Sequence, residues 1–166
     1  MKEHHKEVEN TARKWLHERG VTIEDIAELV YFLQEKYVEN LSMEACEENV
    51  NRVLSKREVQ NAILTGIQLD RLAEEEKLDH PLQGIIERDE GLYGVDEVIA
   101  LSIVNVYGSI GFTNYGYIDK LKPGILKKLN DKSQGCHTFL DDIVGAIAAA
   151  ASSRLAHSQD GTEEDD

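Results

Sequence analysis

Residues 139–156, FLDDIVGAIAAAASSRLA, decide the fold of this chain. From Val144 to Ala151 the segment is apolar on every side and consists almost wholly of small residues. A helix of this composition has no polar face, so it cannot lie on the surface of a globular protein. We therefore expect a helix from about Phe139 to Ala156 at the centre of the molecule, with other helices packed closely around it.

The rest of the chain contains further helical patterns, in which apolar residues recur three and four positions apart. Boundary signals include a capping arrangement at Thr22-x-x-Asp25, a capping box at Ser55-x-x-Glu58 and a terminating glycine at Gly20. The predicted helices cover residues 6–19, 22–37, a stretch after Ser42, 55–78, 95–107 and 123–129. We expect an all-α fold: one multihelical domain of about six helices over residues 1–156, with the small-residue helix surrounded by the others.

Two stretches interrupt the helical periodicity. Residues 79–94 contain one proline and three glycines, which predicts a long loop in the middle of the domain. Loops of this length in a compact domain are often functional. A second stretch, with Gly108, Gly111 and Gly116, predicts a glycine-rich turn. Residues 157–166 hold five acids without apolar periodicity, which predicts a disordered tail.

The charge balance excludes several classes of function. Lys and Arg number 18 against 32 Asp and Glu, a formal net charge of −14 for 166 residues. Such a chain does not neutralise a run of phosphates, which excludes a nucleic-acid partner, and the same charge opposes unaided adhesion to an anionic membrane. No apolar run approaches the roughly 20 residues of a bilayer-spanning helix. The charged N-terminus lacks a signal sequence, and Cys46 and Cys136 form no CxxC pair, so we predict a cytoplasmic location.

Two acidic pairs stand at the starts of apolar helices: Asp96-Glu97, and Asp141-Asp142 after Thr138. One interpretation is structural, because acids in a first helical turn complement the helix dipole and Thr138 forms a capping pair with Asp141. The other is functional: clustered carboxylates bind a hard divalent cation, which takes oxygen ligands and bridges to phosphate oxygens. Neighbouring residues on a helix diverge by about 100°, so we expect one strong ligand from each pair.

A third polar element runs from Ile118 to Pro123 and places an acid, Asp119, and a base, Lys122, beside a helix start. The base and the exposed amides there suit an anion, although the segment read alone is equally a solvated turn. Two histidines, His80 and His137, lie in predicted loops near the candidate acids. They serve either as proton donors or as ordinary surface residues.

Other phosphatase and nucleotide-binding motifs are absent from the sequence. Cys46 and Arg52 have the C-x5-R spacing of thiol phosphatases, but the residues between them include two glutamates and no glycine. Those glutamates oppose both phosphate binding and thiolate formation. No Asp-x-Asp nucleophile motif follows an apolar strand, neither proline follows an arginine, and no P-loop or dinucleotide-binding glycine pattern exists.

Three motifs follow one another in the second half of the chain. They are Val95-Asp96-Glu97-Val98-Ile99-Ala100, then Asp119-x-x-Lys122-Pro123-x-Ile125, then Gly135 followed by Leu140-Asp141-Asp142-Ile143-Val144-Gly145-Ala146. Their order and approximate spacing resemble the phosphatidylglycerophosphatase A family, which has a (V/W)DE helix start, a D-x-x-K-P segment and an (L/I)-D-D-(I/V)-V-A-G helix. The likeness covers about residues 79–155 and includes the soluble branch of low-temperature-requirement C proteins from Gram-positive bacteria.

The resemblance implies a chemistry and assigns residues to it. Enzymes of the family are magnesium-dependent and remove the terminal phosphate of phosphatidylglycerophosphate to give phosphatidylglycerol. Carried onto this sequence, the implied ligands of Mg²⁺ or Mn²⁺ are Asp96, Glu97, Asp119 and Asp142. The implied catalytic residues are Asp141, Asp142 and Lys122, and the implied contacts to the phosphorylated substrate are Lys122 and Gly135. The soluble branch is also expected to have one central helix surrounded by others.

Three hypotheses about function follow. The first is a Mg²⁺-dependent phosphatase that acts on the phosphorylated headgroup of a lipid. The second keeps this chemistry but takes a soluble phosphoester. The third is a non-catalytic helical regulatory or scaffold protein of the same fold. Each is compatible with a homo-oligomer, and none includes nucleic acid or a membrane-spanning segment as partner or anchor.

Overall fold

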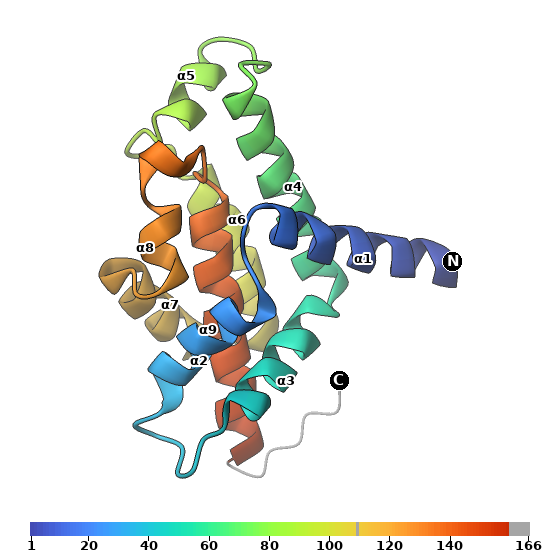
Figure 1. Ribbon diagram of the computed structural model, residues 1–166, viewed down its shortest axis with the longest axis vertical. Helices are drawn as coiled ribbons and strands as arrows, with labels where there is room; N and C mark the ends of the chain where they lie inside the picture. The colour runs from blue at the N-terminus through green and yellow to red at the C-terminus, as the bar shows by residue number, and fades with distance from the viewer. Residues whose placement is uncertain (109, 160–166) are drawn as a thin grey trace.

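The computed structural model describes residues 1–108 and 110–159, and over those residues it contains helices and no strand (Figure 1). The helices of the first half are α1 (Lys2–Glu18), α2 (Ile23–Gln34), α3 (Met43–Leu54) and α4 (Arg57–Glu74). Those of the second half are α5 (Leu82–Glu87), α6 (Val95–Val104), η1 (Asn105–Tyr107), α7 (Ile110–Leu121), α8 (Ile125–Leu129), η2 (Lys132–Gln134) and α9 (Leu140–Gln159). The all-α single domain is confirmed, but the described residues form nine α-helices rather than about six.

Two of these helices, α5 and α7, lie in stretches whose glycines and proline predict a loop and a turn. Glycine is a poor helix former, costing about 1 kcal/mol relative to alanine, and here tertiary packing overrides that preference. In α7, Gly111 lies against both α6 and α9: a Cβ at this position would come within 2.9 Å of Val104 Cγ1 and 3.1 Å of Ser153 Oγ. This glycine is therefore explained by close helix packing and not by a turn.

The small-residue helix α9 is the centre of the fold, as the sequence predicts. It is buried from Leu140 to Ser153, and α2, α3, α4, α6, α7 and α8 all pack against it. Figure 1 shows it running vertically through the molecule with the other helices around it. A Cβ on Gly66 of α4 would clash with Phe139 and Ile143, which shows how closely the neighbouring helices approach. The apolar composition of α9 is thus matched by burial on every side.

Local capping signals are partly correct. Thr22 Oγ1 accepts a hydrogen bond from the Asp25 amide at 3.1 Å, and the Asp25 carboxylate accepts one from the Thr22 amide at 2.9 Å, as predicted. The capping box predicted at Ser55-x-x-Glu58 is wrong. Helix α4 begins at Arg57, and Ser55 Oγ donates instead to the Arg52 carbonyl at 2.6 Å, because the serine belongs to the end of α3.

The cap of α9 comes from a residue far away in the sequence. Asp70, fully buried on α4, accepts hydrogen bonds from the backbone amides of Phe139 at 3.1 Å and Leu140 at 3.0 Å. Thr138 Oγ1 donates to the Ile86 carbonyl at 2.6 Å instead of capping the helix, so the expected capping pair of Thr138 with Asp141 is replaced. These bonds fix the start of α9 against α4 and α5.

The C-terminal end of α9 lies beyond the predicted boundary. The helix continues to Gln159, so residues 157–159, expected in a disordered tail, are helical. The remainder of that predicted tail, residues 160–166, lies outside the described residues. Within the part of the chain that the structure describes, no helix combines the length and apolarity needed to cross a bilayer.

Candidate functional site

A cleft of about 400 Å³ lies where the starts of α6 and α9 meet the end of α7. All five carboxylates singled out by the sequence motifs line it, together with the lysine of the second motif. These residues are Asp96, Glu97, Asp119, Asp141, Asp142 and Lys122. The fold therefore gathers, at one place, acids that are widely separated along the chain.

Helix starts and ends determine how each acid reaches the cleft. Asp96 and Glu97 occupy the first turn of α6, and Asp141 and Asp142 occupy the first turn of α9. Of the first pair, Asp96 is buried while Glu97 is exposed, as expected for neighbours that diverge around a helix. The two residues of the second pair are both buried, because α9 is surrounded on every side.

Lys122 is the one cation that lines the cleft among the described residues, and it is paired twice. Its Nζ donates to Asp119 Oδ1 at 2.7 Å and lies 3.4 Å from Asp141 Oδ2. Burial acts to lower the pKa of Lys122, but the hydrogen bond to Asp119 and the charge of Asp141 outweigh it, and the net shift is upward. The ammonium therefore stays charged and holds two carboxylates near the first turn of α9.

The two aspartates of α9 repel one another in a buried setting. Burial raises the pKa of Asp141, and Lys122 opposes part of that shift. The pKa of Asp142 is raised by burial, by the charge of Asp141 and by a hydrogen bond with the Asp96 carboxyl. The cleft thus holds more negative charge than its single lysine balances.

A buried tyrosine hydroxyl near the carboxylates of the cleft has no hydrogen-bond partner among the described residues. Tyr115 of α7 is 8% exposed, and its phenol oxygen is buried and unbonded. Burial raises the pKa of this phenol, and the charge of Asp142 raises it further, followed by those of the other nearby carboxylates. A buried hydroxyl without a partner costs free energy, so this oxygen is a candidate partner for a bound water or ligand.

Two acids of the cleft were not identified from the sequence. Asp89 and Glu90, in the loop between α5 and α6, also line the cleft. The pKa of half-buried Asp89 is raised by burial and by the charge of Asp96. The signal for this loop was present, because its length and its glycines mark residues 79–94 as a functional segment. Tyr115 carried no such signal, since it lies in a stretch read as a turn.

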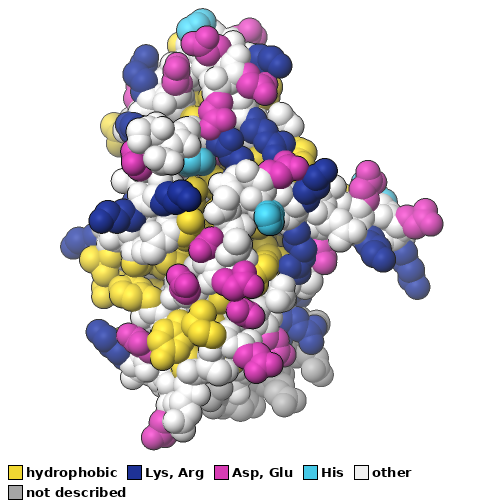
Figure 2. Space-filling model, viewed as in Figure 1, with side chains coloured by type: hydrophobic (Ala, Val, Ile, Leu, Met, Phe, Trp, Pro, Cys, Tyr) yellow, Lys and Arg dark blue, Asp and Glu magenta, His cyan; other side chains and the backbone are white. Residues whose placement is uncertain are grey.

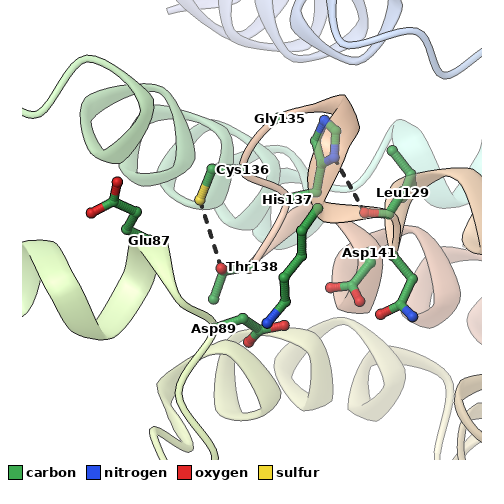
Figure 3. Close-up of a pocket in the computed structure, with 10 residues that line it drawn as sticks. Glu87, Asp89, Leu129, Gly135, Cys136, His137, Thr138 and Asp141 are labelled. Atoms are coloured by element: carbon green, nitrogen blue, oxygen red, sulfur yellow. Dashed lines mark hydrogen bonds between the residues drawn. The ribbon is translucent and has the colours of Figure 1, made fainter.

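A second pocket of about 210 Å³ adjoins the cleft and shares Asp89, Asn130 and Asp141 with it. Figure 3 shows Glu87, Asp89, Thr138 and Asp141 around this pocket. Gly135, expected to contact the substrate, lines this adjoining pocket and not the carboxylate cleft.

The histidines named from the sequence lie apart from the carboxylates of the cleft. His137 lines the adjoining pocket, and its Nδ1 donates to the Leu129 carbonyl at 3.2 Å (Figure 3). Burial lowers the pKa of His137, and the charge of Arg19 lowers it further. His80 is exposed and lines neither pocket. Neither ring therefore occupies the position of a proton donor within the cleft.

An ion pair holds the segment that leads into α9. Arg19 donates to both carboxylate oxygens of Glu74, at 2.9 and 2.7 Å, and also to the Cys136 carbonyl at 2.7 Å. Glu74 Oε1 in turn accepts the Cys136 amide at 2.8 Å. A Cβ on Gly135 would come within 2.6 Å of that same oxygen, and the residue has φ +120°. Gly135 therefore lets the backbone approach Glu74, which is a structural reason for this glycine.

The oxygen donors of the cleft suit a hard divalent cation. Mg²⁺ is bound in proteins by one or two carboxylates and keeps several waters, so it does not require an enclosed protein cage. The described residues contain no group of three His, Cys, Asp or Glu side chains close enough to enclose an ion. The surplus negative charge fits a hydrated cation placed between the carboxylates.

Comparisons with known proteins agree with the motifs. The family model described as phosphatidylglycerophosphatase A matches residues 15–157, a range that also takes in α2, α3 and α4. A Bacillus subtilis relative, uncharacterized protein YutG, is 71% identical over 158 residues, which is 95% of each chain. The resemblance drawn from the three motifs is therefore confirmed over most of the molecule.

Solved structures share the same fold. The crystal structure of low temperature requirement C protein from Listeria monocytogenes has a TM-score of 0.91 and 70% identity, covering 92% of this chain and 97% of that one. A protein of unknown function from Bacillus stearothermophilus has a TM-score of 0.89 and 79% identity, covering 90% of this chain and 94% of that one. The fold of the described residues is thus shared by these relatives.

Proposed function

The chain belongs to the phosphatidylglycerophosphatase A family, and we propose that it is a Mg²⁺-dependent phosphomonoesterase that converts phosphatidylglycerophosphate to phosphatidylglycerol. One observation carries the proposal: the acids of all three motifs and Lys122 line a single cleft. Capping alone explains an acid at the start of one helix, but it does not explain why two helix starts and one helix end direct acids to the same place.

The candidate cation ligands are Asp96, Glu97, Asp119 and Asp142, which approach the cleft from three helices. When bound there, Mg²⁺ or Mn²⁺ would polarise the phosphoryl group and neutralise charge that develops in the transition state. The protein's own contribution is to crowd carboxylates in a buried place. Crowding raises the free energy of the ionised, cation-free cleft and thereby favours cation binding.

Lys122 supplies the positive charge that faces the substrate phosphate. Its ammonium is held by Asp119 and Asp141 within hydrogen-bond and ion-pair distance, so its position is set before substrate arrives. A preorganised charge of this kind stabilises a transition state without reorganising during the reaction. Lys122 therefore binds the non-bridging phosphate oxygens and stabilises them as the ester bond breaks.

We assign to Asp141 the role of the base that receives a proton from the attacking water. Its Oδ1 accepts the Asp142 amide at 2.8 Å and its Oδ2 faces Lys122, which fixes the plane of the carboxylate. The upward shift of its pKa, caused by burial, makes it a better base than an exposed aspartate. Asp142 is the alternative, as a nucleophile that attacks phosphorus directly.

A soluble phosphoester is the second candidate substrate. The cleft is lined mainly by polar side chains and backbone, with Leu92 and Tyr93 as its large apolar residues. Such a lining recognises a phosphorylated headgroup but offers no apolar channel for acyl chains. The headgroup chemistry is shared by the lipid and by glycerol phosphate, so only a comparison of the two substrates decides between them.

The test is phosphate release from phosphatidylglycerophosphate in micelles and from glycerol phosphate, each with and without Mg²⁺. We expect Mg²⁺-dependent release that Asp142→Asn lowers by about 100-fold or more. Glu48→Gln, which removes one exposed negative charge on α3, is the control and retains activity. If no phosphate is released from either substrate and titration calorimetry detects no Mg²⁺ binding, the phosphatase assignment fails and a non-catalytic role replaces it.

A further inference from the structure

Lysines are concentrated beside the cleft in a chain that is otherwise strongly acidic. Residues 119–132 contain five lysines and only two acids, whereas the whole chain has 18 basic against 32 acidic residues. The five are Lys120, Lys122, Lys127, Lys128 and Lys132. This segment is therefore locally positive in a protein whose formal net charge is −14.

The positive segment borders the candidate site directly. It comprises the end of α7, the whole of α8 and the start of η2. Lys122 and Asn130, which flank α8, line the cleft, and Lys132 lines the adjoining pocket. Figure 2 shows Lys or Arg side chains gathered over α8 on the face toward the viewer. A surface that met these lysines would lie next to the carboxylates.

Three of the lysines are available to a partner. Lys120, Lys127 and Lys128 are exposed, and no acidic side chain in the described ranges pairs with them. By contrast, Lys122 is engaged with Asp119 and Asp141. The free ammonium groups are thus outside the site machinery and point to an external anion.

Exposed apolar side chains lie on α7 beside these lysines. Tyr117 and Leu121 are one helical turn apart, and each is 49% exposed. Tyr117 stacks on Phe32 of α2 with the ring centroids 6.1 Å apart. Figure 2 shows a group of hydrophobic side chains over α7, next to the basic side chains over α8. Lysines adjacent to tyrosine and leucine are the side chains that interfacial membrane-binding surfaces use.

We propose that this α7–α8 face, made of Lys120, Lys127, Lys128, Tyr117 and Leu121, docks the protein on an anionic lipid surface. The net charge of the whole chain opposes adhesion to an anionic membrane, but the local charge of this face is positive. At physiological ionic strength the Debye length is about 8 Å, so the charges of acids on distant helices are screened. The lysines of this face then determine the electrostatic interaction with a surface that it contacts. Each lysine close to an anionic membrane contributes independently to adhesion. The inference rests on the proposed function, since docking brings a lipid headgroup to the cleft.

Sedimentation with vesicles tests the docking without any catalytic readout. The full chain should bind vesicles rich in phosphatidylglycerol at 0.1 M salt and should not bind phosphatidylcholine vesicles. Lys127→Glu with Lys128→Glu should lower the partition coefficient by about tenfold or more. Lys2→Glu with Lys6→Glu is the control, because it makes the same change in net charge at two exposed positions of α1 and should change the partition by less than about twofold.

The outcomes separate docking from catalysis. If the unaltered chain fails to bind the anionic vesicles, or if both double variants lose binding equally, the docking face is overturned. It is also overturned if the α8 variant binds vesicles normally but has a raised KM for glycerol phosphate, since the lysines then attract a soluble substrate. Vesicle binding that follows the expected pattern supports docking, even if no chain releases phosphate and the proposed function fails.

Discussion

The carboxylate of Asp70 accepts the backbone amide of Leu140 at 3.0 Å, although the two residues lie on different helices. A second bond, from the amide of Phe139 at 3.1 Å, completes the cap. Amides at a helix N-terminus have no partner within their own helix, and here the partner comes from α4. The acidic pair that follows in α9 does not supply these two bonds, and both of its side chains line the cleft.

Removing this cap should destabilise the protein. Asp70→Ala leaves two buried amides unbonded, so we expect the free energy of unfolding to fall by about 2 kcal/mol. Asp70→Asn keeps one accepting oxygen and should lose less. Urea denaturation at pH 7 measures both, and an Asp70→Ala variant as stable as the unaltered chain would contradict the cap.

Stability should fall as the pH rises from about 4 to about 8. Burial raises the pKa of Asp70 to about 8 and also raises those of Asp141 and Asp142. In this window the folded chain holds protons that the unfolded chain has released, so raising the pH favours unfolding. Urea denaturation at pH 5 and pH 8 should show the difference. Asp70→Asn should reduce it, while Glu48→Gln, at an exposed position, should leave it unchanged.

Two helical glycines should respond in opposite ways to alanine. A Cβ on Gly66 would overlap the side chain of Ile143 on α9, so Gly66→Ala should lower stability by about 1–3 kcal/mol. Gly116 of α7 has nothing within 4 Å of the same atom, and there Gly116→Ala should raise stability by up to about 1 kcal/mol. Thermal unfolding of the pair checks this, and equal effects would argue against the close contact of α4 with α9.

Removal of the unbonded Tyr115 hydroxyl should weaken Mg²⁺ binding without lowering the stability of the fold. Tyr115→Phe removes a buried oxygen that has no partner, so the cation-free protein should be at least as stable as before. If the hydroxyl is satisfied by a hydrated cation, Mg²⁺ affinity should fall by about threefold or more in titration calorimetry. A variant that is less stable but binds Mg²⁺ normally would assign the hydroxyl a structural role.

Substitution of Lys122 should lower catalysis without weakening cation binding. Lys122→Gln removes the charge that faces the phosphate, and phosphate release from glycerol phosphate should fall by about 100-fold. Mg²⁺ should bind at least as tightly, because the same change removes a positive charge from the cleft. Lys120→Gln, two residues earlier on an exposed face, is the matched control. Parallel loss of both properties would show that Lys122 only supports the structure.

The composition of residues 139–156 was sufficient to predict a buried central helix, because a segment without a polar face can be stable only when it is surrounded. The three ordered motifs likewise identified the family and six of the residues that line the cleft. These features are local: each depends on residues within a few turns of one helix. The motifs therefore predicted which acids lie together, and the chemistry assigned to them stays a prediction.

Tertiary packing alone decided the rest. The glycines of α7 predict a turn from sequence alone. In the structure they lie in a helix, because α6 and α9 pack so closely against Gly111 that a side chain there would not fit. Close packing overrides the weak local preference of glycine. Asp70 could be noticed only as an acid on the apolar stripe of its helix, and its partners lie on a helix far along the chain. The convergence of the carboxylates depends on how α6, α7 and α9 meet. The directions of helix ends are set by packing between helices and not by residues next to them in sequence.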